Sequence, residues 1–174
     1  AGIDWSTKVE GGEIEKKWKG GFSGITGILI DNPMALIDSI MPSPTLEDKI
    51  KALKDAERIC LNHGLTTVND AGIDRNTIEL IDSLQQVGEL SIRVYAMVSN
   101  NKEDVDYFIN NGPIKTNRLN VRSVKVYGDG ALGSRGAALK EPYSDLPSHF
   151  GAMVTPVAEI ENLANRLALS EYQM

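Results

Sequence analysis

The sequence predicts an α/β fold built on a parallel sheet, and this prediction rests on strand spacing and helix signals after residue 44. Short apolar runs that suit strands begin at Thr66, Ile92 and Val121, and stretches with helical spacing lie between them. Strands that alternate with helices in this way form parallel sheets through right-handed crossovers. The predicted strands are Thr66 to Asp70, Ile92 to Val98 and Val121 to Tyr127.

The helices are predicted from apolar spacing and from their end signals. In the first 44 residues only one helix is indicated, and it starts at Asp31-Asn32-Pro33. The next helix begins with a capping pair, Thr45 and Asp48, and ends at Gly64. A last helix starts after Thr155-Pro156 and runs almost to the end, with no strand expected after it. The apolar stripe of the helix that starts at Thr45 is Leu46, Ile50, Leu53 and Ile59. Two more helices are predicted before the last one, with the stripes Ile78, Ile81, Leu84 and Val87, and Val105, Phe108 and Ile109.

Composition excludes several classes of partner. The 174 residues carry 24 acidic and 18 basic side chains, a net charge of −6, which argues against binding to nucleic acid or to an anionic membrane. No apolar run reaches the length of a membrane span, and the first residues lack the pattern of a signal peptide. The single cysteine, Cys60, excludes an internal disulfide and fits a reducing compartment. We therefore expect a cytoplasmic protein.

A lysine within the last predicted strand is the sharpest candidate for chemistry. Side chains alternate along a strand, so Val124 and Val126 share one face while Ser123, Lys125 and Tyr127 share the other. Parallel strands are normally covered on both faces, and burial of an ammonium group is costly unless something compensates for it. A long glycine-rich loop follows the strand, so Lys125 is predicted to lie beside a functional loop.

Several stretches of this chain together resemble one enzyme family. Val124-Lys125 leads into Asp-Gly-Ala-Leu-Gly-Ser-Arg at 129–135 and Glu-Pro-Tyr-Ser-Asp at 141–145, and Gly-Leu-Thr-Thr-Val-Asn-Asp-Ala-Gly occupies 64–72. Looser matches lie at 11–14 and 26–29. Over nearly its whole length the chain resembles the YtcJ-like branch, family 3, of the metal-dependent amidohydrolases.

The resemblance implies a partial (β/α)₈ (TIM-barrel) fold. Residues 1–44 are then an inserted segment, and 45–174 are a barrel sector of about three strand-helix units. The chain is short of the roughly 250 residues of a closed barrel, and the resemblance implies an internal fragment of a longer parent. An unclosed sheet leaves an edge and an apolar inner face without partners, so self-association is expected.

The resemblance also implies a function for the parent: hydrolysis of an amide or other non-peptide carbon–nitrogen bond in a small molecule by metal-activated water. One or two divalent ions, with zinc expected, serve as cofactors. Lys125 is implied to carry a carbamate that bridges the metal ions. The general base and most metal ligands are expected outside this chain, which alone is predicted to be inactive and to bind no metal tightly. A snorkelling lysine, or one paired with Asp129, is the structural alternative.

The loop after Lys125 offers candidates for substrate contact. Asp129, Arg135 and Tyr143 are the residues expected to contact substrate or to order the loop. Arginine binds carboxylates through two parallel hydrogen bonds, which makes Arg135 the best of these for recognition, and a loop-stapling role is equally open. Gly136 stands where the family more commonly has threonine.

Two other classes of function remain as alternatives. Gly128 to Gly133 matches the dinucleotide-binding fingerprint, but Pro142 stops any helix that could receive a pyrophosphate, and no acidic strand end follows at the expected distance. The other alternative is a non-catalytic binding or assembly module. Structural roles are predicted for His63 as a helix cap, for His149 and for Cys60, while Asp70 could cap a turn or support an active site.

Overall fold

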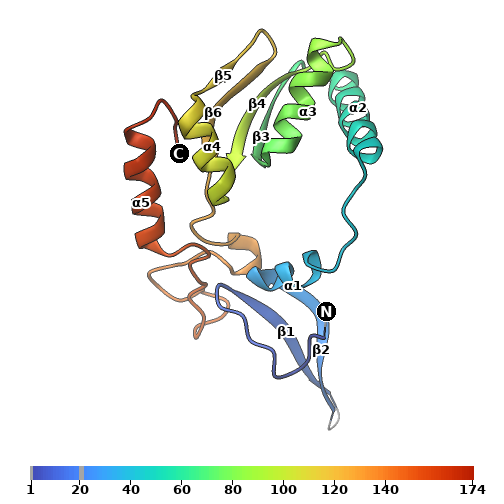
Figure 1. Ribbon diagram of the computed structural model, residues 1–174. Helices are drawn as coiled ribbons and strands as arrows, with labels where there is room; N and C mark the ends of the chain where they lie inside the picture. The colour runs from blue at the N-terminus through green and yellow to red at the C-terminus, as the bar shows by residue number, and fades with distance from the viewer. Residues whose placement is uncertain (1, 20–21) are drawn as a thin grey trace. The chain divides into compact units, whose positions relative to one another are not determined.

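The computed structural model describes residues 2–19 and 22–174 (Figure 1). The chain divides into two compact units. The first contains residues 1–42 and 127–160, and the second contains residues 43–126 and 161–174. The predicted boundary at residue 44 remains a prediction, and each unit is described by itself below.

The second unit is built on a mixed four-stranded sheet in the order β3-β4-β6-β5. The strands β3 (Thr67–Ile73), β4 (Arg93–Ser99) and β6 (Leu119–Lys125) are parallel neighbours, as predicted. The short strand β5 (Ile114–Lys115) pairs antiparallel with the start of β6 and was not predicted, because two residues carry no periodicity. The α/β class is therefore confirmed, with an antiparallel strand added.

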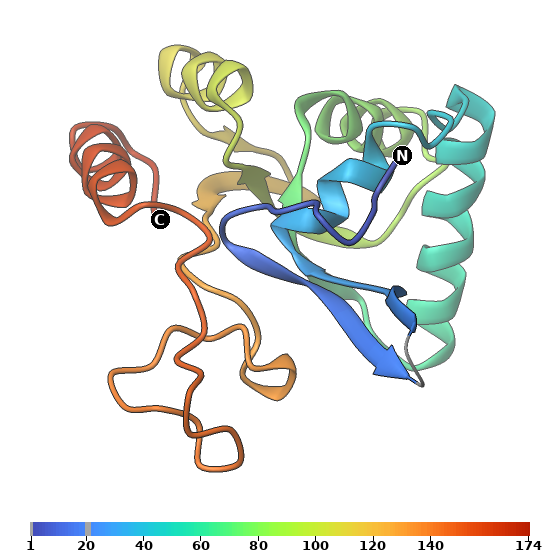
Figure 2. The ribbon, with the colours of Figure 1, turned by 90° about the horizontal axis from the view of Figure 1, so that it is seen from below.

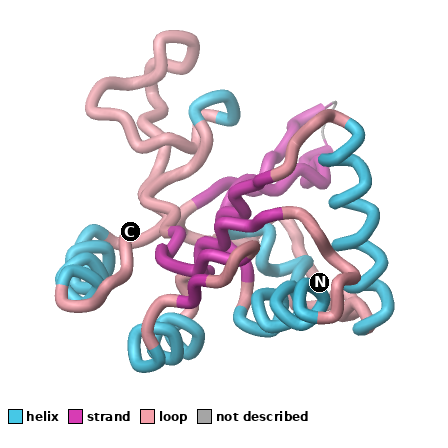
Figure 3. The backbone as a smooth tube through the Cα atoms, turned by 90° about the horizontal axis from the view of Figure 1, so that it is seen from above, coloured by secondary structure: helices cyan, strands magenta, loops and turns pink. Residues whose placement is uncertain are grey.

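Helices α2 (Leu46–Asn62), α3 (Arg75–Gln86), α4 (Lys102–Asn111) and the part of α5 (Val157–Ala168) that belongs to this unit complete it. Figure 3 shows the helices on one side of the strands. The capping pair is confirmed, because Thr45 and Asp48 form a complete capping box at the start of α2. The stripe predicted on α2 is only partly packed: Leu46 and Ile59 are mostly exposed.

The core lies between these helices and one face of the sheet. Alternate residues of β4 are buried, which is the signature of a strand covered on one side. The buried core side chains include Val94, Ala96, Val98, Leu119, Val121 and Val124 from the strands and Ile78, Ile81, Val105, Phe108, Leu163 and Leu167 from the helices.

The opposite face of the sheet carries mainly polar side chains in layers set by the strand register. Asn69, Tyr95 and Asn120 form one layer, since β3 and β4 pair at Asn69 and Tyr95 and β4 and β6 pair at Tyr95 and Asn120. Nearer the carboxyl ends, Ser99 pairs with Lys125. The expectation of an apolar inner face is therefore wrong for these layers.

A single residue after α5 pairs with the sheet. Gln173 forms a parallel bridge with Ser123, donates from its backbone N to Arg122 O at 2.9 Å, and accepts from Val124 N at 2.9 Å. In the described chain no strand follows α5, as expected, and Gln173 forms only this single bridge. One residue carries no periodic signal, so the sequence could not reveal this bridge.

The first unit contains an antiparallel hairpin of β1 (Gly12–Lys19) and β2 (Phe22–Asp31), drawn in blue in Figure 2. The hairpin was missed because the lysines of β1 and the glycines of β2 interrupt the apolar alternation by which a strand is recognised. The helix predicted from Asp31 is much shorter than expected, consisting of the 3₁₀ turn η1 (Asn32–Met34) and the four-residue α1 (Ala35–Asp38). Residues 127–156 form a long loop whose only helical turn among the described residues is η2 (Leu132–Ser134). No helix in the described part of the chain is long and apolar enough to cross a membrane.

Candidate functional site

Lys125 lies where the sequence predicted it, at the carboxyl end of β6 and on the face opposite the core. Val124 is buried in the core, and Val126 packs against it. The Lys125 ammonium donates to the carbonyl of Val126 at 3.2 Å. Lys125 is half-buried, so the strand presents its side chain at the rim of the polar face.

Small residues flank Lys125 on the neighbouring strands. Its partner on β4 is Ser99. Gly72, where the pairing of β3 with β4 is irregular, has a positive φ of 100° and lies close to both. A β-carbon built on Gly72 would lie 3.6 Å from Lys125 Cγ and 3.8 Å from Ser99 Oγ, which is ordinary contact. Three carboxyl strand ends therefore converge around Lys125 with little side-chain bulk.

Candidate metal ligands are few. No group of three or more His, Cys, Asp or Glu side chains in the described residues is arranged to hold a metal ion. Asp70 is exposed on β3, and its roles stay open. His63 is the C-cap residue of α2, as predicted, and Cys60 packs against the core. Lys125 is thus the one ligand of the proposed metal site that this chain is predicted to supply.

In the first unit, all three predicted loop residues bind within the loop, and Asp129 and Tyr143 do so through its backbone. Asp129 accepts a hydrogen bond from Ala138 N at 2.9 Å through Oδ2, and its backbone pairs antiparallel with Met153. Tyr143 is buried and donates from its hydroxyl to Ala137 O at 2.9 Å. Both side chains therefore order the loop; a contact with substrate stays a prediction.

Arg135 has an unusual backbone conformation and is bound through both its side chain and its carbonyl. Its backbone is left-handed with φ 59°, which few residues other than glycine adopt. Its guanidinium binds the Asp145 carboxylate, with Nη2 2.8 Å from Oδ2 and Nε 3.3 Å and 3.2 Å from the two oxygens. These bonds hold the pKa of the Asp145 carboxyl below its ordinary value, and Asp145 in turn raises the pKa of the guanidinium. The imidazole Nε2 of His149 lies 2.8 Å from Arg135 O, and serves as donor in the tautomer that is protonated there. The loop-stapling role is thus observed, and the substrate role of Arg135 stays a prediction.

Asp31 is a residue that sequence reasoning missed. Its Asp-Asn-Pro context indicated only a helix start, yet its side chain packs against the glycine-rich loop about 100 residues later. A β-carbon on Gly136 would lie 2.5 Å from Asp31 Oδ2, and one on Gly130 would lie 2.9 Å from Asp31 Cγ. The paired glycines could have signalled a close approach, but not its partner.

The nucleotide-binding alternative finds no support in the loop. A pyrophosphate site needs an α-helix that starts directly after the glycines. In the described loop, Gly128 to Gly133 leads only into the three-residue turn η2, and the next α-helix begins at Val157. The match to the fingerprint is therefore one of letters only.

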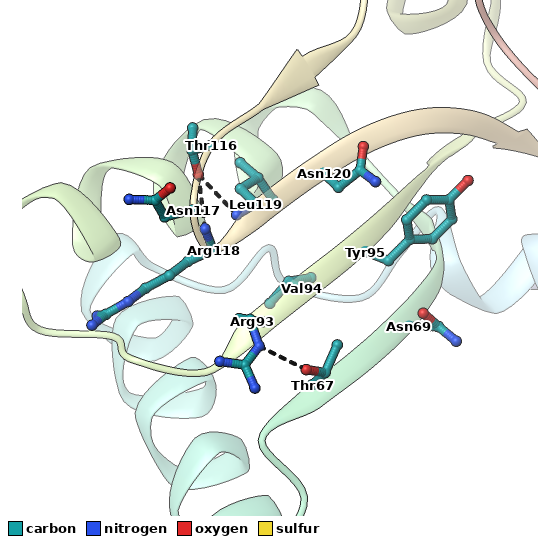
Figure 4. Close-up of a pocket in the computed structure, with 10 residues that line it drawn as sticks. All are labelled: Thr67, Asn69, Arg93, Val94, Tyr95, Thr116, Asn117, Arg118, Leu119 and Asn120. Carbon is teal, nitrogen blue, oxygen red and sulfur yellow. Dashed lines mark hydrogen bonds between the residues drawn. The ribbon is translucent and has the colours of Figure 1, made fainter.

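A pocket of about 330 Å³ lies at the other end of the parallel strands (Figure 4). Arg93 at the start of β4 donates from Nε to Oγ1 of Thr67, at the start of β3, at 2.9 Å. Thr116, in the turn between β5 and β6, accepts from Leu119 N. The pocket includes the amino ends of the strands, whereas Lys125 stands at a carboxyl end. It is therefore separate from the candidate site.

Comparisons with known proteins agree with the motifs. A model of the amidohydrolase family matches residues 1–174. Protein LONG AFTER FAR-RED 3 of Arabidopsis thaliana is 27% identical over 151 residues, covering 79% of this chain and 26% of that protein. The putative amidohydrolase YtcJ of Bacillus subtilis (strain 168) is 29% identical over 160 residues, covering 88% and 29%.

Solved structures give the same result. An uncharacterized metal-dependent hydrolase from Pyrococcus horikoshii OT3 superposes with a TM-score of 0.67 at 30% identity, covering 78% of this chain and 28% of that one. A second from Pyrococcus furiosus gives 0.69 at 26% identity, covering 80% and 30%. The chain thus spans less than a third of the length of each of these relatives and shares its α/β fold with parts of metal-dependent hydrolases. The chain belongs to the amidohydrolase family, in its family 3 or YtcJ-like branch.

Proposed function

We propose that this chain is part of a metal-dependent amidohydrolase that cleaves an amide or another non-peptide carbon–nitrogen bond of a small molecule with water. The observation that carries the proposal is the position of Lys125 at the carboxyl ends of the parallel strands, on the face opposite the helices. In (β/α)₈ enzymes the active site lies at the carboxyl ends of the strands. We accordingly assign residues 45–174 to a barrel sector and 1–44 to an inserted segment.

Lys125 would act as a metal bridge. A neutral lysine amine adds carbon dioxide and releases one proton, which leaves a carbamate with two oxygens placed like those of a carboxylate. The role is supported by the position of Lys125 at the carboxyl end of β6, where the small residues Gly72 and Ser99 lie beside its stem. Zinc is the proposed ion; when bound, it polarises a carbonyl and lowers the pKa of water. The remaining ligands and the general base belong, in this proposal, to the longer protein.

The loop after β6 would recognise the substrate. Arg135 is the proposed recognition residue, because its fork of donors suits a carboxylate and already binds that of Asp145. Asp129 and Tyr143 would keep the loop in shape through their bonds to Ala138 and Ala137. A substrate carboxylate would then replace Asp145 as the partner of Arg135.

Replacement of Lys125 in the longer protein tests the proposal. We expect Lys125→Ala to lose bridged metal and at least about 100-fold in hydrolysis, as expected for the loss of a metal ligand group. Folding should survive better than activity, because Val124 and Val126 keep their packing. Short carboxylic acids should partly restore turnover by occupying the vacated space. The matched control is Lys115→Ala, an exposed lysine of the same sheet.

The decisive comparison is metal content and hydrolytic rate at equal folded concentration. Full metal loading with near-normal turnover in Lys125→Ala would leave Lys125 a structural lysine and remove the proposed mechanism. A metal-loaded wild-type protein without hydrolysis of any amide-like substrate would instead favour a binding or assembly module.

A further inference from the structure

Asp31 has a backbone conformation that is unusual for a residue with a side chain. Its φ of 59° and ψ of −129° lie in the region that glycine dominates and that asparagine and aspartate also enter. A strained residue of this kind persists where the surroundings hold it in place. Glycine would fit the turn with less strain, so the presence of aspartate indicates that its side chain has a task.

The Asp31 carboxylate fills a notch left by two glycines. Gly130 and Gly136 each lack the β-carbon that would overlap it, since a β-carbon on Gly136 would come within 2.5 Å of Oδ2. Gly136 is buried and Asp31 is half-buried. The contact joins the end of β2 to the loop after β6 inside the first unit.

The same two glycines form the neck of a small loop. Gly130 N donates to Gly136 O at 3.2 Å, and Gly136 N donates to Ala131 O at 3.0 Å. Residues 131–135, which contain η2 and Arg135, project between these two closely spaced points. A side chain packed on both glycines therefore acts on both ends of the loop at once.

We propose that Asp31 is a positioning residue that pins the neck of the 130–136 loop and so sets the place of Arg135. It acts by filling the glycine notch with a side chain of fixed shape. The Arg135 backbone then needs no reordering when a substrate carboxylate replaces Asp145, because this backbone is left-handed at a closed neck and its carbonyl is held by His149. The role rests on the proposed function of Arg135, but the pinning itself is independent of it.

Amide hydrogen exchange in the 174-residue chain tests the pinning. The reporters are the Gly130 and Gly136 amides, whose hydrogen bonds close the neck. We expect Asp31→Ala and Asp31→Gly to raise their exchange about 10-fold, because local opening becomes easier. Asp31→Asn, which keeps the shape, should stay near wild type. The control is Asp38→Ala, an exposed acidic residue of the same unit.

Thermal unfolding distinguishes pinning from simple stabilisation. Asp31→Gly relieves the strained turn, so its midpoint should not fall even though neck exchange rises. The proposal is overturned if the Gly130 and Gly136 amides exchange at the wild-type rate in both Asp31→Ala and Asp31→Gly. It is also overturned if these amides exchange as fast in Asp31→Asn as in Asp31→Ala, since a matching side-chain shape would then not suffice.

Kinetics in the longer protein tests the link to substrate. Asp31→Ala should raise KM at least about fivefold with metal content unchanged and kcat affected less, because a loosened loop weakens binding to Arg135. Asp31→Asn should restore KM. An unchanged KM beside raised neck exchange would overturn the positioning role. Absence of hydrolysis in the wild-type protein would count against the proposed function alone, because the exchange experiment still decides whether Asp31 pins the neck.

Discussion

Removal of the Glu57 carboxylate should loosen the join between α2 and β4. One oxygen, Oε1, accepts from Ser91 N at 2.5 Å, Ser91 Oγ at 2.8 Å and Ile92 N at 2.8 Å. Hydrogen bonds to a charged acceptor contribute roughly 1.5–3 kcal/mol each when buried, but Glu57 is only half-buried and water replaces part of this. We therefore expect Glu57→Ala to lower the free energy of unfolding by about 2 kcal/mol in total, and Glu57→Gln by about 1 kcal/mol.

The pH dependence provides a second, independent check. Burial alone would raise the pKa of Glu57, but the hydrogen bonds from Ser91 and Ile92 lower it below the ordinary 4.5. A folded pKa below the unfolded one gives stability that is present above pH 4.5 and is lost as the pH falls through the folded pKa. The difference between wild type and Glu57→Gln should therefore shrink below that pH.

Urea unfolding of the 174-residue chain between neutral and acid pH would measure both effects. The matched control is Glu47→Gln, an exposed acid in the first turn of α2, which should change stability by no more than about 0.5 kcal/mol. If Glu57→Ala and Glu47→Gln cost the same at neutral pH, the assignment of Glu57 as the clamp on the start of β4 is refuted.

Three further predictions concern pH, metal and association. Burial raises the pKa of Tyr172 from 10.0 to about 12, so its contribution to stability should be complete below pH 10 and lost as the pH rises through 12, a loss that Tyr172→Phe should remove in alkaline unfolding curves. The 174-residue chain should bind zinc weakly, because one ligand cannot fix a metal, and stoichiometric tight zinc in the purified chain would contradict this. The chain should also self-associate, since β3 is the first strand of the described sheet and presents an unpaired edge, whereas a compact monomer by light scattering at high concentration would count against it.

Local sequence patterns were sufficient to predict elements whose structure depends on nearby residues. The apolar run from Ile92 to Val98 identified β4, and the alternation of side chains along the next strand placed Lys125 on the face opposite Val124. Thr45 and Asp48 were readable because a capping box is local. Each of these features depends on neighbours within a few residues, which is the range over which a single sequence carries a direct signal.

Features that depend on distant partners were not readable. Gln173 adds to the sheet through Ser123, about 50 residues earlier, and Asp31 meets Gly136 about 100 residues later. The hairpin of β1 and β2 forms although lysines and glycines interrupt its apolar alternation, since pairing across strands overrides the local pattern. For the candidate site, the position of Lys125 was predictable, whereas the residues that hold Arg135 were not.

The division of the chain assigns the two halves of the proposed chemistry to different structural units. Lys125 stands on the sheet of the second unit, and the first unit resumes two residues later, at Tyr127. Arg135 stands on the loop of the first unit, ordered by Asp145, His149 and Asp31. A sheet core and a loop differ in local stability, so the loop can change its order without cost to the strand that carries the lysine. On the proposed roles, substitutions in the 130–136 loop should change KM with metal content unchanged, and substitution of Lys125 should change metal content, which kinetics and metal analysis of the longer protein would separate.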